Sequence, residues 1–208
     1  MRYDRKNHYL TDEPSRWRVR VIFELPENAL HAWISAFDTS PQSAEELFRT
    51  SAARYPDVSI QLVDLDRVPG RRYLKLATVN ATKSFHSKQP IAKTLGMEIL
   101  LYISAEKQIA RALKRVGITA DTCRIAAVAV SVHRDQVLAA ANLLAVTMGR
   151  ESDDRPLDDW SQQRIKNVRS GYEIGDKELE AVIQENETET MVIERLAVER
   201  SAMLAAKK

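Results

Sequence analysis

Residues 88–116 read KQPIAKTLGMEILLYISAEKQIARALKRV, and they set the expected order of elements in the middle of the chain. Met97–Ile103 is almost entirely apolar, which is typical of a strand that is covered on both faces. The preceding Ile91–Leu95 predicts a short helix that Gly96 ends, because a glycine just past the last helical residue suits a left-handed cap. Ser104 is a suitable cap for a further, basic helix, whose apolar residues are expected to point inward: Ile109, Ala112, Leu113 and Val116. We therefore expect an apolar strand between two helices.

Three more segments outside this stretch have the pattern of strands. Arg16–Leu25 alternates apolar and polar residues with a period of two and ends before Pro26, and Val58–Leu65 has a similar alternation. Cys123–Val132 is a second apolar run of the kind found in interior strands. Together with residues 97–103, these segments predict a central mixed sheet of about four to five strands.

Apolar residues at helical spacing predict the remaining elements. We expect a mixed α/β (α+β) fold in which helices flank the sheet and the C-terminal part is helical. Residues 16–206 are expected to form one domain after a flexible tail at residues 1–15. Besides the helices next to residues 97–103, the expected helices are 27–37, 43–55, 71–86, 133–148, 158–169, 177–184 and 188–206.

The positive charge of the chain is concentrated between Arg67 and Val116. This segment has eleven Lys and Arg against two Glu, a net charge of +9 in a chain whose total is +2. Such a concentration indicates a polyanionic partner, most often nucleic acid, although a solvated face without a partner is the alternative. His86 and Tyr73 are candidates for stacking on a base, and the alternatives are a surface histidine without a special role and a tyrosine of the core. The candidate nucleic-acid-binding residues are Arg71, Arg72, Lys75, Lys83, His86, Lys88, Lys107, Gln108, Arg111, Lys114 and Arg115.

Two helices are candidates for contact with another protein. The expected helix 133–148 has little charge and is apolar around most of its circumference, so it is either deeply buried or covered by a partner. The expected helix 188–206 carries an apolar stripe, and packing of the two helices on each other is the alternative. The candidate docking residues are Val137, Leu138, Val192, Leu196 and Met203.

The sequence lacks the common motifs of catalysis and of phosphate binding. Its four histidines are scattered, so we expect no metal site and no cofactor. Cys123, the single cysteine, is expected to be a small buried apolar residue rather than a nucleophile, and a chain with one cysteine favours a reducing compartment. No apolar run is long enough to span a bilayer and no signal-peptide pattern is present, which predicts a cytoplasmic protein without membrane contact.

The segment from Gly70 to Val116 also resembles a known family, the smallest regulatory subunit of the KEOPS complex, which includes the PRPK-binding protein. The chain has Tyr73 where the family often has His, and Glu106-Lys107 where the family often has Gly-Arg. The similar segments are Gly70-Arg71-x-x-Leu74, Ile91–Tyr102, Lys107-Gln108-Ile109 and Ala112-Leu113, with weaker similarity at Ile174–Leu179 and Glu194–Ala197.

The resemblance implies an accessory subunit, not an enzyme. KEOPS adds a threonylcarbamoyl group to the adenosine next to the anticodon of certain tRNAs, and its transferase subunit performs the chemistry. The subunit resembled here binds the atypical kinase/ATPase subunit directly and the transferase only indirectly, and in archaea it recruits tRNA by the single-stranded 3′ CCA end. The alternatives are a free-standing RNA-binding module without a kinase partner and an enzyme with an unrecognised site.

Overall fold

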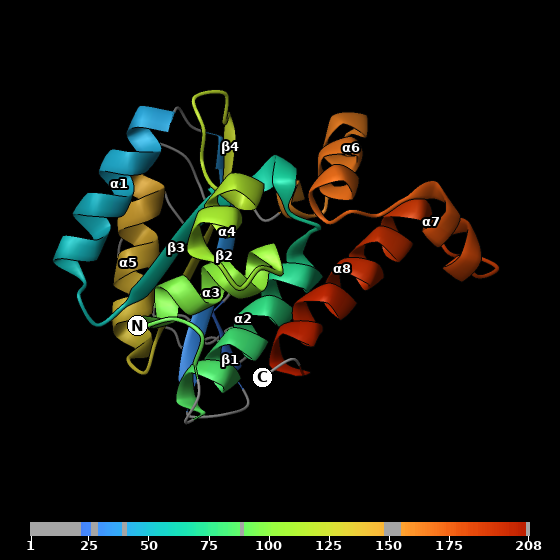
Figure 1. Ribbon diagram of the computed structural model, residues 1–208. Helices are drawn as coiled ribbons and strands as arrows, with labels where there is room; N and C mark the ends of the chain where they lie inside the picture. Colours follow the sequence, from blue (N-terminus) through green and yellow to red (C-terminus); the bar gives the residue numbers. More distant parts are fainter. Residues whose placement is uncertain (1–21, 26–28, 39–40, 88–89, 148–154, 207–208) are drawn as a thin grey trace, which may run out of the picture.

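The computed structural model describes residues 22–25, 29–38, 41–87, 90–147 and 155–206. In this part of the chain, eight α-helices and a four-stranded sheet form an α+β fold, which confirms the expected fold class (Figure 1). The expected tail at 1–15 and most of the expected strand 16–25 lie outside the described residues.

The sheet has the order β1-β2-β4-β3, and each neighbouring pair is antiparallel. The expectation of a mixed sheet is therefore wrong for the described strands. β4 is an interior strand between β2 and β3, and it pairs Ala129 with Trp33 on one side and with Ile60 on the other. The strands are β1 (Ile22–Leu25), β2 (Leu30–Asp38), β3 (Ser59–Asp64) and β4 (Arg124–Ser131).

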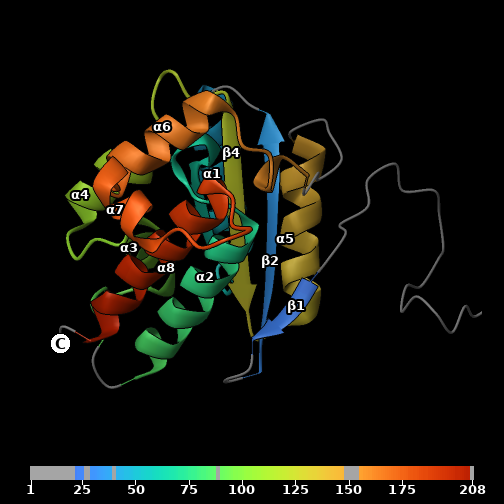
Figure 2. The ribbon, with the colours of Figure 1, turned by 90° about the vertical axis from the view of Figure 1, so that its right-hand side faces the viewer.

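Helices cover both faces of the sheet (Figure 2). Two helices, α1 and α5, cover one face, and the others lie on the opposite side. Since alternate residues of a strand point to opposite faces, each central strand contributes to two separate cores. The helices are α1 (Pro41–Arg54), α2 (Arg71–His86), α3 (Leu95–Ser104), α4 (Ile109–Val116), α5 (Arg134–Thr147), α6 (Gln162–Gly171), α7 (Asp176–Val182) and α8 (Glu189–Ala206), with the short turns η1 (Leu65–Arg67) and η2 (Arg155–Leu157).

The helix expected at Glu27–Phe37 is wrong, because Leu30–Asp38 forms the strand β2. Leu30 and Ile34 face the larger core, while Trp33 and Phe37 face the smaller one. A strand that is buried on both faces loses its polar alternation, and its large side chains then fall at a spacing that also fits a helix.

The strand expected at Met97–Ile103 is wrong for the converse reason. These residues belong to α3, in which seven consecutive residues, Glu98–Ser104, are buried. The helix packs against α2, α4, α8 and β3, so that almost no side faces water and no amphipathic period remains. Thr94 caps the start of α3, and Gly96 lies in its first turn instead of ending a helix.

Most of the other elements lie close to where the sequence predicts them, including the strands β3 and β4, which are buried on both faces. This holds for α1, α2, β3, β4, α5, α7 and α8. α6 begins four residues later than expected, because Ser161 is its cap and accepts a hydrogen bond from the backbone N–H of Arg164. Cys123 is exposed just before β4, so its expected burial is also wrong.

Candidate nucleic-acid and partner-binding surfaces

One face of α2 carries exposed basic side chains, as the sequence predicts. Arg72, Lys75, Lys83 and His86 are exposed, while Tyr73, Leu74, Ala77 and Ala81 on the other face are buried in the core. A helix with one packed face and one solvated face presents its cations in a row, because residues three and four apart are neighbours. We call these four exposed residues the α2 basic patch.

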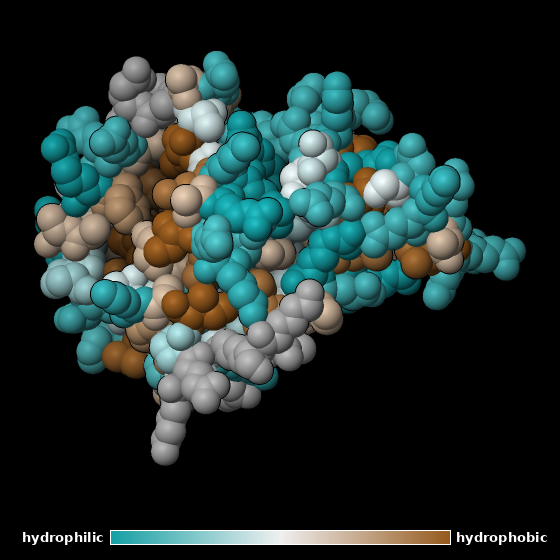
Figure 3. Space-filling view, in the orientation of Figure 1, coloured by the Kyte–Doolittle hydropathy of each residue, from teal (hydrophilic) through white to brown (hydrophobic). Residues whose placement is uncertain are grey.

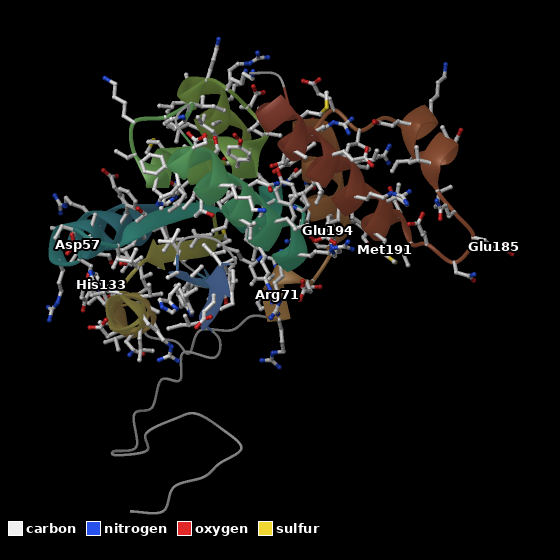
Figure 4. All side chains as sticks on the ribbon, turned by 90° about the horizontal axis from the view of Figure 1, so that it is seen from below. Asp57, Arg71, His133, Glu185, Met191 and Glu194 are labelled. Atoms are coloured by element: carbon white, nitrogen blue, oxygen red, sulfur yellow. The ribbon has the colours of Figure 1, made fainter. Side chains whose placement is uncertain are left out.

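Arg71 and Lys75 of α2 make contacts within the chain. The Nε atom of Arg71 lies 2.9 Å from a carboxylate oxygen of Asp158, so this half-buried arginine already carries an ion pair. Figure 4 shows Arg71 at the start of α2. The ammonium group of Lys75 lies over the ring of Phe23 in β1, 4.9 Å from its centre, but the side chain stays exposed.

A second group of cations lies on α4 and just before it. Lys107, Gln108, Arg111 and Lys114 are exposed, and Figure 3 shows a hydrophilic surface over this helix. Arg111 also lies 3.8 Å from a carboxylate oxygen of Glu106. We call Lys107, Arg111 and Lys114 the α4 basic patch.

The apolar residues of α4 are packed less completely than expected. Ala112 and Val116 are buried, but Ile109 and Leu113 are 42% and 49% exposed. An eight-residue helix makes only two turns, and here a narrow edge of it meets the core. The expectation that Ile109 and Leu113 point inward is therefore wrong.

Arg115 does not belong to the exposed basic surface. Its side chain is 14% exposed and pairs with Glu106 at 2.6 Å. It also donates a hydrogen bond to the carbonyl oxygen of Ser104 at 2.7 Å and lies over the ring of Tyr172. Arg115 thus joins the end of α3 to α4 and to the residue after α6, and Glu106 is the acid that neutralises it.

Tyr73 is not available for stacking. Its side chain is fully buried, and its hydroxyl donates to the carbonyl oxygen of Ile103 at 2.6 Å, near the end of α3. Burial raises the pKa of Tyr73 well above its usual value. His86 is exposed, with Nδ1 2.8 Å from the carbonyl oxygen of Thr82, and remains a candidate. Lys88 lies outside the described residues.

The two basic patches lie in the same layer of the molecule but do not merge. α3 packs against both α2 and α4 and lies between them, on the side of the sheet away from α1 and α5 (Figure 1). The two patches are therefore separate exposed surfaces on one side of the sheet.

The candidate docking residues divide into buried and exposed ones. Val137, Val192 and Leu196 are buried in the cores of this chain, so their side chains are not available to a partner. Leu138 and Met203 are 36% and 48% exposed. α5 and α8 lie on opposite sides of the sheet, so the two helices do not pack on each other, and a single flat interface does not include both residues (Figure 2).

Two hollows lie away from the predicted residues. An open groove of about 780 Å³ runs beside α6 and the start of α8, and a smaller hollow of about 240 Å³ lies next to Cys123. Nothing in the sequence marks the groove, which mixes polar and charged side chains such as Lys166, Arg169 and Glu189. Among the described residues, no group of three or more His, Cys, Asp or Glu side chains can hold a metal ion.

A family model described as kinase binding protein CGI-121 matches residues 40–203, most of the chain. The chain belongs to this family. The CGI-121 match extends from the start of α1 to the last turns of α8, and it includes both basic patches and both exposed docking candidates. It confirms the family resemblance of residues 70–116. No curated protein sequence matches the chain. No helix in the described part of this CGI-121 protein is long and apolar enough to cross a membrane.

Proposed function

We propose that this CGI-121 family member is a non-catalytic accessory subunit of the KEOPS complex for threonylcarbamoyladenosine modification of tRNA. In that role it binds the atypical kinase/ATPase subunit directly, meets the transferase only through that subunit, and recruits tRNA by the 3′ CCA end. The observation that supports this most is the family match, because it spans the exposed cations of α2 and α4.

The exposed charge supports tRNA as the second partner. The α2 and α4 basic patches lie on one side of the sheet and are separated by α3, so an elongated phosphate backbone can contact both. His86 is exposed at the end of α2 and offers a ring on which an unpaired base can stack. A free-standing RNA-binding module accounts for the same cations, but it does not explain why the chain belongs to a family of kinase-binding proteins.

The kinase is proposed to dock through one of the two exposed apolar candidates, Leu138 on α5 or Met203 on α8. Leu138 lies on the side of the sheet opposite to the basic patches, and Met203 on the same side. Docking at Met203 thus places the kinase on the same side of the sheet as the tRNA, whereas docking at Leu138 places the two on opposite sides.

Co-purification of the tagged full-length chain from its own cells tests the proposal. We expect the atypical kinase and the transferase to be recovered together, with tRNA that dissociates at high salt. Recovery of the kinase without a transferase contradicts assembly into KEOPS. Recovery of RNA without a kinase favours the free-standing module.

A further inference from the structure

Glu98 in the first turn of α3 is a charged residue without exposed surface. Among the described residues, no Lys or Arg forms an ion pair with it. A carboxylate in such a place is strongly disfavoured unless hydrogen bonds satisfy its oxygens. The groups that donate hydrogen bonds to the Glu98 carboxylate therefore indicate which segments of the chain it holds in place.

Three groups donate hydrogen bonds to the Glu98 carboxylate. The hydroxyl of Ser84, near the end of α2, donates at 2.6 Å. The backbone N–H groups of Ile91 and Ala92 donate at 3.3 Å and 2.6 Å. One buried carboxylate thus joins the end of α2, the connection that follows it and the start of α3.

The described part of the connection between α2 and α3, residues 90–94, is held by these bonds and by the packing of Ala92 in the core. Ile91–Thr94 forms neither helix nor strand, so regular secondary structure does not hold it. Ala92 is buried, whereas the next residue, Lys93, is exposed. Lys93 therefore lies at the surface between Ala92, whose backbone N–H is bonded to Glu98, and Thr94, which caps α3.

Other cations are exposed beside this connection. Lys83 and His86 occupy the last turn of α2 and belong to the α2 basic patch. Ser84, which donates to Glu98, lies between them in the sequence. The same carboxylate thus contacts both segments that carry these exposed groups.

We propose that Glu98 is a positioning residue for RNA, whose buried carboxylate holds the α2–α3 connection so that Lys93 contacts a tRNA phosphate next to the α2 basic patch. The proposal rests on the proposed tRNA binding. It makes a counter-intuitive prediction, namely that an acid is needed for binding to a polyanion. Simple charge repulsion predicts the opposite sign for the loss of Glu98.

The test compares Glu98→Gln with Glu180→Gln, which removes the same charge from an exposed residue of α7. The amide that Glu98→Gln introduces cannot accept all three bonds, because its nitrogen is a donor. We expect Glu98→Gln to weaken binding of a tRNA transcript about fivefold or more and to lower the log–log salt slope by about 0.7–0.9, the value of one lost phosphate contact. Glu180→Gln is expected to bind as well as wild type or slightly better.

Lys93→Ala separates positioning from general damage. The substitution changes an exposed residue and leaves Glu98 and its hydrogen bonds intact. We expect it to lower the log–log salt slope by the same amount as Glu98→Gln does. In the double variant the effect of Glu98→Gln should shrink, because the contact through which Glu98 acts is already gone. All of these variants should bind the kinase with wild-type affinity when binding is measured well below their melting temperatures. If Glu98→Gln does not fold, Lys93→Ala alone decides the phosphate contact.

Tight tRNA binding by Glu98→Gln, or by Lys93→Ala, would overturn the inference while leaving tRNA binding itself established. Equal effects of Glu98→Gln in the wild-type and Lys93→Ala backgrounds also overturn it, because the carboxylate then acts elsewhere. If the wild-type chain binds no tRNA at all, the proposed function fails first, and the two failures are distinguishable.

Discussion

The carboxylate of Glu194 in α8 accepts a hydrogen bond from the backbone N–H of Tyr73 in the first turn of α2, at 3.0 Å. The residue that precedes α2 is Gly70, which has no side chain to cap the helix and a φ of +144° that favours glycine. Glu194 therefore supplies the missing cap from 121 residues further along the chain. Two segments with family resemblance, Gly70–Leu74 and Glu194–Ala197, meet at this contact (Figure 4).

We expect Glu194→Ala to lower the free energy of unfolding by about 1–2 kcal/mol, because the N–H of Tyr73 loses its acceptor. Glu194→Gln keeps an oxygen that can accept the bond and should cost less. Urea denaturation of the two variants checks this. Equal losses in both variants would show that the negative charge, not the hydrogen bond, is what stabilises α2.

The same pair predicts a pH dependence. Burial raises the pKa of Glu194, while the bond from Tyr73 and the nearby Arg72 oppose the shift. The folded chain then holds this proton more tightly than the unfolded chain, so stability falls as the pH rises from the ordinary value of about 4.5 through the raised pKa. The stability of the Glu194→Gln variant should therefore rise relative to that of the wild type over that pH range. Burial also raises the pKa of Asp64, but Asp64 is present in both proteins and cancels in the difference.

Arg164 in α6 is a second buried residue with a structural role, and its substitution is our next prediction. Its guanidinium donates to the carbonyl oxygens of Val68, Pro156, Leu157 and Asp159 at 2.6–3.1 Å, which joins the segment before α2 to the segment before α6. Burial lowers the pKa of Arg164 to about 10, so it is still charged at neutral pH.

Arg164→Lys leaves some of these buried carbonyl groups without a donor, since an ammonium group lacks the planar fork of the guanidinium. We expect a loss of about 3 kcal/mol or more in the free energy of unfolding. Arg169→Lys is the control: it changes a partly exposed arginine of the same helix, whose partners are the carboxylates of Asp176 and Glu189, and should cost about 1 kcal/mol or less. Similar losses in the two variants would contradict a special role for Arg164.

Sequence periodicity identifies the helices that keep an exposed face, whereas an apolar run assigns the type of a fully buried element correctly for β4 but not for every such element. α2 has a basic face and a packed face, and its predicted bounds are those of the structure. β2 and α3 are covered on every side, so the pattern of the first predicts a helix and that of the second a strand, both wrongly. Their true type depends on which elements pack around them, and that information lies outside their own residues.

The candidate surface can be predicted to the level of the helix but not of each side chain. The exposed cations of α2 follow from its amphipathic pattern. Arg115 faces inward because Glu106 and Tyr172 lie where α4 meets α6, a contact that the pattern of α4 does not contain. A signal for Glu98 is present, however, since a single acid within an apolar run requires internal hydrogen bonds once the run is buried.

The two basic patches give a prediction for the salt dependence of tRNA binding. We expect Arg72→Ala, Lys75→Ala and Lys83→Ala together to weaken binding and to reduce the log–log salt slope by about 2–3. The reason is that each phosphate contact that is lost lowers the number of counterions released on binding by about 0.7–0.9. The corresponding triple variant of the α4 patch should act similarly. The control is a triple alanine variant of the exposed Arg49, Lys166 and Lys177, which lie outside the segment 67–116. Unchanged affinity in both folded patch variants would rule out these helices as the tRNA surface.

We further expect the unpaired 3′ end of tRNA to contribute to binding. Base stacking on a side chain contributes about 1–3 kcal/mol per base, so removal of the terminal CCA should weaken binding about tenfold or more. His86→Ala should reduce the difference between intact and trimmed tRNA, since its ring is the exposed candidate for stacking. Equal affinity for intact and trimmed tRNA in a fluorescence titration would place recognition in the double-stranded parts instead.

The final prediction concerns the face that binds the kinase. We expect either Leu138→Glu or Met203→Glu, but not both, to weaken kinase binding by about 100-fold, because a charge desolvated at an apolar anchor costs several kcal/mol. Both residues are exposed in the free chain, so neither substitution should change its melting temperature. Thr50→Glu, which adds the same charge to the exposed surface of α1, is the control.

Calorimetry with the isolated kinase subunit distinguishes the outcomes. An effect of Leu138→Glu places the kinase against α5 and leaves the basic side open, so that tRNA and kinase bind together. An effect of Met203→Glu places it on the same side as the basic patches, and tRNA should then compete with the kinase or bind it cooperatively. If both variants bind normally, docking at α5 and α8 is wrong. The exposed Ile109 and Leu113 of α4 then become the next anchors to substitute, because they are a further pair of apolar side chains that the chain leaves half uncovered.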